Sequence, residues 1–340
     1  MSTVKIRKRK QFILTMVTLI LLIIVMFFIS LSTGVIQITP MEVINTLLHN
    51  GTEQQALILF DFRLPGIVLA LFIGAMLAVS GTILQGVTQN DLADPGILGI
   101  NTGAGLAVVL YIYFFQDMLT LSGPQSIFLM PFAALLGALF AAGLIYLLAW
   151  RSGVNPIRLV LVGIGVNAGF SAILTILQLR MDPQNYRQVT VWLAGDIWNA
   201  NWNFVLALLP WALLLIPIAI YKAKALDVFN LGDEVAAGLG INVEKERGLL
   251  LLIAVALAGA AVAAGGAIAF LGLVVPHIAR KLIGPLHQMI IPISTLIGAV
   301  LLMIADTIGK NILAPSEIPV GIVVSILSAP YFIYLLMKVK

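Results

Sequence analysis

The sequence predicts an all-α integral membrane protein with about ten membrane-spanning helices. Of its 340 residues, 61% are hydrophobic and only 10% are charged, whereas soluble domains carry roughly 25% charged residues. Continuous apolar runs such as 12–29 and 204–220 are long enough to cross a bilayer as helices, and they lack the alternation of β-barrel strands. This composition leaves no room for a large soluble domain, so we expect 1–340 to form a single transmembrane domain.

Charged, proline and glycine residues divide the apolar sequence into spans. The run after the basic N-terminus is long for a signal peptide and lacks a small-residue cleavage site, so we expect an uncleaved first span. The stretch 248–284 is long for one span and short for two, but Gly265–Gly266 offers a break between two short helices. The predicted spans are 11–31, 65–88, 96–115, 126–149, 157–178, 203–221, 248–266, 267–284, 289–308 and 318–337.

The distribution of Lys and Arg favours ten spans over nine. With ten, 15 of the 19 basic residues lie on the side of the N-terminus, and only Arg63, Arg180, Arg187 and Lys310 lie on the other. Treating 248–284 as one span would change this division to 12 against 7. Because basic residues concentrate in cytoplasmic loops, we expect both termini in the cytoplasm. The same topology accounts for the net charge of +4 without a nucleic-acid partner.

A polar stretch interrupts the apolar pattern after the second span. Residues 81–105 read GTILQGVTQNDLADPGILGINTGAG and include the amides of Gln85, Gln89, Asn90 and Asn101. Such groups are costly when they are buried in lipid without partners, so they either line water or bond neighbouring helices. The sequence leaves both roles open.

Four blocks resemble the membrane permeases of ABC importers for iron–siderophores, haem and vitamin B12. Residues 81–99 resemble the family pattern G-x-x-x-Q-x-x-x-x-N-P-L-A-D-P-x-x-L-G, with Asp91 where the family usually has proline. Residues 266–280 resemble G-x-I-x-F-x-G-L-x-x-P-H-x-x-R. Both patterns fix many positions in a short stretch, so the resemblance is specific.

The two remaining blocks carry basic residues. Residues 305–336 resemble the closing block A-D-x-x-A-R…E-L-P-V-G…G-A-P-x-F, with Lys310 at the basic position. Residues 63–66, RLPG, resemble R-L-P-R, with Gly66 in place of the second arginine. The four blocks occur in the family's order, and the resemblance covers the chain from about residue 60 to its end.

The resemblance implies the type II importer permease fold, as in the vitamin B12 permease (BtuC-like), in the bacterial cytoplasmic membrane. Two permease subunits would form a pore, two copies of a separate ABC ATPase would bind below, and an extracytoplasmic binding protein or lipoprotein would deliver an Fe(III)–siderophore. The segment at about 222–247 would contact the ATPase through a short helix. The implied pore-lining residues are Gln85, Gln89, Asn90, Asn101 and Asn167; the implied coupling residues are Asp233, Glu234, Gly238, Gly240, His277 and Arg280; the implied docking residues for the binding protein are Arg63 and Lys310.

Other functional classes find less support. The chain lacks a G-x-x-x-x-G-K-[ST] phosphate loop, so we expect no ATP hydrolysis and no enzymatic activity of its own. His277 has no second ligand at a suitable spacing and cysteine is absent, so we expect no metal site and no cofactor. An ion-coupled secondary transporter is the alternative, with Asp306 as its main acidic candidate.

The missing arginine at Gly66 favours a heterodimer with a second permease over a homodimer.

Overall fold

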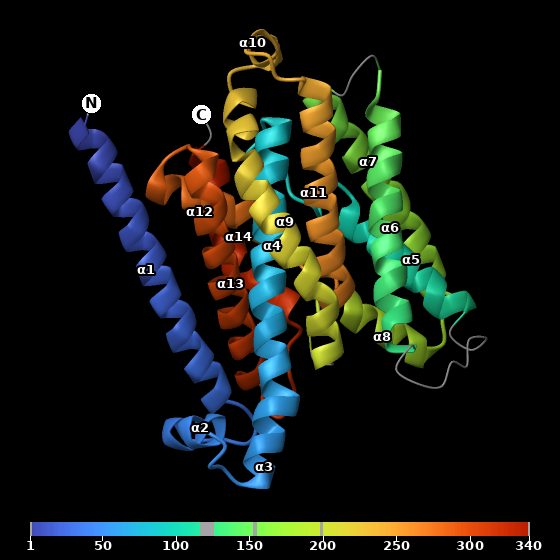
Figure 1. The fold of residues 1–340 in the computed structure, drawn as a ribbon. Helices are drawn as coiled ribbons and strands as arrows, with labels where there is room; N and C mark the ends of the chain where they lie inside the picture. The colour runs from blue at the N-terminus through green and yellow to red at the C-terminus, as the bar shows by residue number, and fades with distance from the viewer. Residues whose placement is uncertain (1, 116–125, 152–154, 198–199, 339–340) are drawn as a thin grey trace.

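The computed structural model describes residues 2–115, 126–151, 155–197 and 200–338, and this part of the chain is built of helices (Figure 1). A helix lies at every predicted span. These helices are α1 (Ser2–Ser32), α4 (Leu64–Thr88), α5 (Ile100–Phe114), α6 (Ser126–Ala149), α7 (Pro156–Gln178), α9 (Trp202–Phe229), α11 (Val243–Gly265), α12 (Leu271–Ile283), α13 (His287–Asn311) and α14 (Val320–Lys338). The shorter elements are α2 (Pro40–Leu47), α3 (Glu53–Ala56), the π-helix η1 (Leu57–Arg63), α8 (Pro183–Leu193) and α10 (Asp233–Gly238).

The predicted break between the seventh and eighth spans is confirmed. Helix α11 ends at Gly265, residues 266–270 are not helical, and α12 begins at Leu271, four residues later than predicted. Seven helices are long and apolar enough to cross a membrane, while α5 and α14 are shorter apolar helices. Helix α12 has 13 residues, a length of about 20 Å, which is less than the hydrocarbon thickness of about 30 Å. It therefore begins inside the membrane layer.

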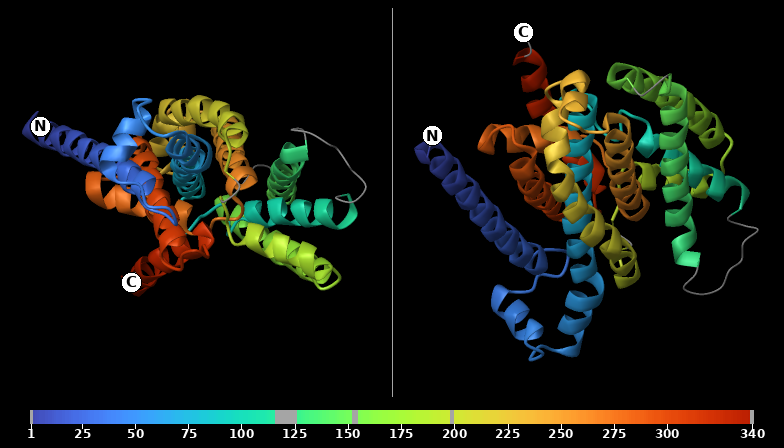
Figure 2. Two further views of the ribbon diagram at one scale, coloured as in Figure 1. Left: turned by 90° about the horizontal axis from the view of Figure 1, so that it is seen from below. Right: turned by 45° about the horizontal axis from the view of Figure 1, so that its top comes forward.

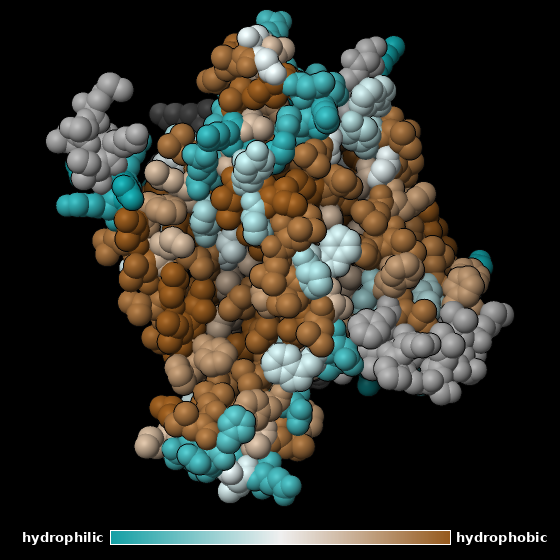
Figure 3. Space-filling view, viewed as in Figure 1, coloured by the Kyte–Doolittle hydropathy of each residue, from teal (hydrophilic) through white to brown (hydrophobic). Residues whose placement is uncertain are grey.

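The distribution of hydrophobic and polar residues on the surface fits helices that cross a membrane. Figure 3 shows a brown hydrophobic band with teal polar residues at the two ends. The N-terminus, the C-terminus and α10 lie at one end, which we call the α10 end, and α2 and α3 lie at the other, the α3 end (Figure 1). Lys340, which the sequence places with the termini, lies outside the described residues.

Local sequence fixes many of the helix starts. Polar side chains accept hydrogen bonds from first-turn backbone amides, which lack partners within the helix. Proline occupies the first turn of α2, α7 and α8, where its missing N–H costs nothing. The capping residues are Thr39, Thr52, Asn155, Asp182, Asn201 and Asn242.

Helix α4 is the most deeply buried span and packs against α9, α11, α12 and α13 (Figure 2). Glycines bring it close to its neighbours. A Cβ atom placed on Gly74 would lie 2.3 Å from the carbonyl oxygen of Gly298 on α13. A Cβ atom on Gly81 would lie 1.9 Å from the carbonyl oxygen of Gly272 on α12. In lipid, such close backbone approach is a main source of helix association.

We predict that Gly81→Val lowers the apparent Tm of the purified protein by several degrees. The new side chain must displace the α12 backbone, and overpacking of this kind costs about 1–3 kcal/mol. Gly165→Val is the matched control, because a Cβ atom there meets nothing within 4 Å. Both variants replace a helical glycine with valine, so helix propensity cancels. Equal melting temperatures in a thermal unfolding assay would contradict the packing argument.

Candidate functional site

The connecting segment 89–99 joins α4 to α5 without helical structure and packs against the start of α12. Gln89 ends α4 in the left-handed conformation, with φ of 51°. Asp94 on this segment is buried, with 4% of its surface exposed. Its carboxylate accepts hydrogen bonds from the backbone amides of Gly96, at 2.7 Å, and of Leu273 in the first turn of α12. A carboxylate at a helix N-terminus satisfies otherwise unpaired amides and interacts favourably with the helix dipole.

Gln85 bonds to the first turn of α12. Its Nε2 donates to the carbonyl oxygens of Gly272 at 3.3 Å and Leu273 at 3.1 Å. Pro276 has no N–H, so the Gly272 carbonyl loses its partner within the helix. Gln85 supplies the missing donor, and its Oε1 accepts a hydrogen bond from Arg280.

Two further polar side chains complete this group. Asn101, at the start of α5, donates from Nδ2 to the carbonyl oxygen of Ile268 at 3.0 Å, within the non-helical stretch 266–270. Arg280 pairs with Asp91 of the connecting segment at 3.0 Å. We call Gln85, Asp94, Asn101 and Arg280 the polar centre, because together they bond the non-helical stretch 266–270 and the first turn of α12 to α4, the connecting segment and α5.

The remaining predicted pore residues lie nearer the surface. Gln89 is exposed and donates to the carbonyl of Phe229 at the end of α9. Asn90 is partly exposed, and its Oδ1 accepts from the backbone amide of Leu92 at 2.9 Å. Asn167 on α7 accepts from the hydroxyl of Thr102. Gln85 and Asn101 thus bond neighbouring segments of the same chain, and the pore-lining role of all five amides stays a prediction.

At the α10 end, α10 protrudes from the body of the molecule (Figure 1). It begins at Asp233 and ends at Gly238, within the segment at about 222–247 where a short helix is predicted. Gly240 follows with φ of 84°. Glu234, Gly238 and Gly240 are exposed, and Cβ atoms on the two glycines would meet nothing within 4 Å. This face of α10 is open to a partner.

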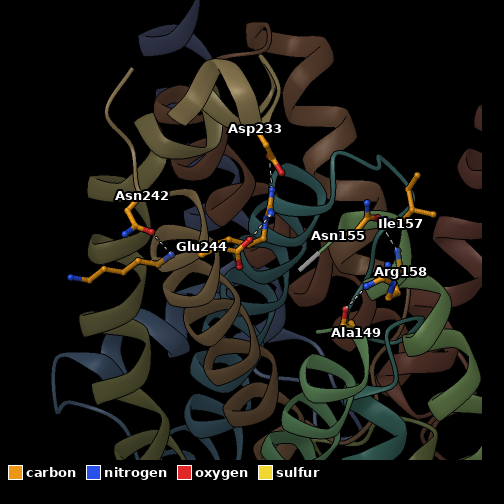
Figure 4. A network of polar contacts seen from close by, with 9 residues as sticks. Ala149, Asn155, Ile157, Arg158, Asp233, Asn242 and Glu244 are labelled. Atoms are coloured by element: carbon orange, nitrogen blue, oxygen red, sulfur yellow. Dashed lines mark hydrogen bonds and ion pairs between the residues drawn. The ribbon is translucent and has the colours of Figure 1, made fainter. Parts of the chain in front are cut away.

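A buried arginine that the sequence analysis missed holds α10 in place. Arg247, in the first turns of α11, is only 1% exposed and pairs with Asp233 at 2.6 Å (Figure 4). It also lies 3.9 Å from Glu244, and its guanidinium lies 5.5 Å from the centre of the Phe229 ring. Breaking a buried ion pair is strongly destabilising, because the remaining charge is left without compensation.

His277 and Arg280 lie on α12, away from α10. The His277 ring lies 5.9 Å from the Tyr331 ring on α14. A second histidine, His287 at the start of α13, is buried and its Nδ1 lies 2.7 Å from Asp227 near the end of α9. Among the residues that the structure describes, His, Cys, Asp and Glu form no group of three suited to hold a metal ion.

The two predicted docking residues lie together at the α3 end. The Arg63 guanidinium donates to the carbonyls of Leu31 and Ile36, so it links η1 to the stretch after α1. Lys310 pairs with the buried Asp306 at 2.7 Å. A Cβ atom on Gly66 would lie 3.2 Å from the Lys310 Nζ, so Gly66 leaves room for this lysine where the family carries arginine.

Comparison with known proteins agrees with this architecture. A sequence model of the FecCD transport family matches residues 21–338. The iron(3+)-hydroxamate import system permease protein FhuG of Bacillus subtilis is 56% identical over 331 residues, covering 97% of this chain and 98% of that protein. The iron-uptake system permease protein FeuC of the same organism is 44% identical, covering 94% of this chain and 96% of that protein.

A solved structure is also similar. It is a metal-chelate type ABC transporter in an inward-facing conformation, with a TM-score of 0.82 and 29% identity over 95% of this chain and 99% of that one. The family match spans almost the whole chain, and the relatives are permeases rather than enzymes. The chain therefore belongs to the FecCD transport family, as a multi-pass membrane permease of the iron–siderophore, citrate and haemin ABC importers.

Proposed function

We propose that this chain is the permease subunit that moves an Fe(III)–siderophore of the hydroxamate type across the bacterial cytoplasmic membrane. The 56% identity to the hydroxamate import permease over nearly the whole chain carries the choice of substrate. A separate ATPase supplies the energy, and an extracytoplasmic binding protein or lipoprotein delivers the chelate. Residues 1–340 act as one transmembrane domain, with both termini and α10 in the cytoplasm.

The pore is proposed to form between this chain and a second, homologous permease. Gln89, Asn90 and Asn167 are the amides with exposed surface, and they lie next to the polar centre that contains Gln85 and Asn101. The heterodimer is favoured because Gly66 and Lys310 give this chain a docking surface with one arginine fewer than the family pattern. A partner permease that keeps both arginines of the R-L-P-R pattern would dock one lobe of the binding protein, and this chain would dock the other lobe with one arginine fewer.

The ion-coupled alternative loses its main candidate residue. Asp306 lies close to the α3 end and its carboxylate is paired with Lys310 at 2.7 Å, an arrangement that suits a fixed ion pair better than a site for a transported proton or sodium ion. The open face of α10, which is held by the pair between the buried Arg247 and the exposed Asp233, instead suits contact with an ATPase.

We predict ATP-dependent uptake when the chain is reconstituted with its permease partner, ATPase and binding protein in proteoliposomes. Radioactive iron bound to desferrioxamine should accumulate with internal ATP and not without it. Proton and sodium ionophores should leave the initial rate unchanged. Uptake that needs an ion gradient but no ATP would overturn the proposed energy source. Uptake of haemin in preference to the hydroxamate would overturn the proposed substrate.

We predict that Asp233→Asn uncouples ATP hydrolysis from uptake. Loss of the ion pair frees α10 from Arg247, so ATPase activity should persist while uptake falls several-fold. The matched control is Lys245→Gln, which changes an exposed charge two residues before Arg247 on α11. Measurement of both activities in the same proteoliposomes tests this. A parallel fall in hydrolysis and uptake would indicate loss of assembly and contradict an uncoupling role.

We predict that docking of the binding protein depends on Lys310. The double variant Asp306→Asn/Lys310→Gln removes the cation without leaving a buried carboxylate unpaired, and Asp306→Asn alone is its reference. Since charges at the rim of an interface act mainly on association, the double variant should slow association more at low salt than at high salt. Arg180→Gln, an exposed basic residue at the same end, is the control for net charge. Equal association rates in stopped-flow measurements would remove Lys310 from the docking surface.

A further inference from the structure

Helices α6 and α11 meet along a seam that opens into a cavity toward the α10 end. They contact closely where a Cβ atom on Gly259 would lie 3.1 Å from the Cβ of Ala138. Beyond this contact they separate around a cavity of about 390 Å³. Its inner wall is formed by Leu84, Leu98 and Ile100, which are buried.

The cavity opens to the outer face of the helices. Leu252 on α11 is 59% exposed and Leu139 on α6 is 36% exposed, and both line the opening. Gly143 lies between them, and a Cβ atom there would meet nothing within 4 Å. Figure 1 shows α6 and α11 at the front of the molecule. Both helices are long and apolar enough to span the membrane, so this opening lies at the depth of the hydrocarbon layer.

The lining selects an apolar occupant. The side chains around the cavity are aliphatic except for Tyr146, so the cavity offers almost nothing to bond a polar solute. A hydrated metal chelate would lose its hydrogen bonds with water there and gain few in return. A hydrocarbon chain that enters from the bilayer loses none, and it gains contacts with the wall.

Cationic side chains lie at the end of the cavity that reaches the membrane surface. Arg158 directly precedes Leu159, which lines the cavity, and its Nη1 lies 3.4 Å from the carbonyl oxygen of Ala149 at the end of α6 (Figure 4). In the described part of the chain, no carboxylate oxygen lies within 4.0 Å of the Arg158 guanidinium. Arg151 nearby is exposed, and Glu244 is directed toward Arg247. The net charge at this mouth is therefore positive.

We propose that this cavity binds one acyl chain of an anionic phospholipid from the leaflet at the α10 end, with the lipid phosphate at Arg158. The aliphatic wall, the opening toward the bilayer and the positive mouth each match one part of such a lipid. The end of the acyl chain would contact Leu98 and Ile100, which lie between Asp94 and Asn101 of the polar centre in the sequence. This site is separate from the proposed path of the chelate.

Native mass spectrometry of the purified, delipidated transporter tests the proposal. Titration with dioleoylphosphatidylglycerol should give one tightly held lipid per copy of this chain, and dioleoylphosphatidylcholine should bind more weakly. Gly143→Leu should abolish this bound lipid, since the new side chain enters the cavity. Arg158→Gln should weaken phosphatidylglycerol about fivefold, the effect expected of one basic residue at an anionic lipid surface. Gly165→Leu adds the same atoms in open space on α7 and should leave lipid binding unchanged.

Two results would overturn the proposal. Retention of phosphatidylglycerol by Gly143→Leu would show that the lipid binds elsewhere. Equal binding of the two lipids to the parent protein would show that the headgroup is not recognised. If Gly143→Leu does not fold, Leu252→Trp at the opening gives the same test, because it narrows the entrance without filling the interior.

Discussion

The architecture depends on satisfying backbone polar groups where a helix is interrupted inside an apolar layer. No water is available at such a depth, so each free amide or carbonyl needs a partner from the protein. The interruption at 266–270 is tolerable because Asn101 bonds the Ile268 carbonyl, Gln85 bonds the Gly272 carbonyl, and Asp94 accepts the Leu273 amide. The three side chains come from the end of α4, the connecting segment and the start of α5, and this explains why polar residues gather in one stretch of an apolar sequence.

This arrangement also requires close packing, and glycine provides it. Gln85 reaches the α12 carbonyls only because α4 and α12 approach closely where Gly81 faces Gly272. A side chain at either position would push the helices apart and lengthen the bonds from Gln85. The polar centre and the glycine contacts are therefore one feature, in which close approach and hydrogen bonding each depend on the other.

Much of this fold could be predicted from the sequence, but the partners could not. The break after Gly265 follows from the paired glycines there, a short helix occurs within the segment 222–247, and all ten spans contain a helix. Gln85 and Asn101 stand out as costly polar groups, yet their acceptors lie 167 to 188 residues away in the chain, beyond any local pattern. Arg247 was missed because a basic residue at the head of an apolar run is typical of an anchor at the membrane surface. Only tertiary packing reveals that it is buried against Asp233 and Phe229.

Helix α11 connects α10 to the interrupted stretch 266–270. Its first turns hold α10 through Arg247, and its last residue leads directly into the interrupted stretch that Asn101 bonds. Its 23 residues form an unbroken rod of about 35 Å. At its far end the chain is clamped, because a Cβ atom on Gly266 would lie 2.2 Å from the carbonyl oxygen of Trp192. A force applied to α10 therefore reaches the interrupted stretch 266–270 through the length of α11.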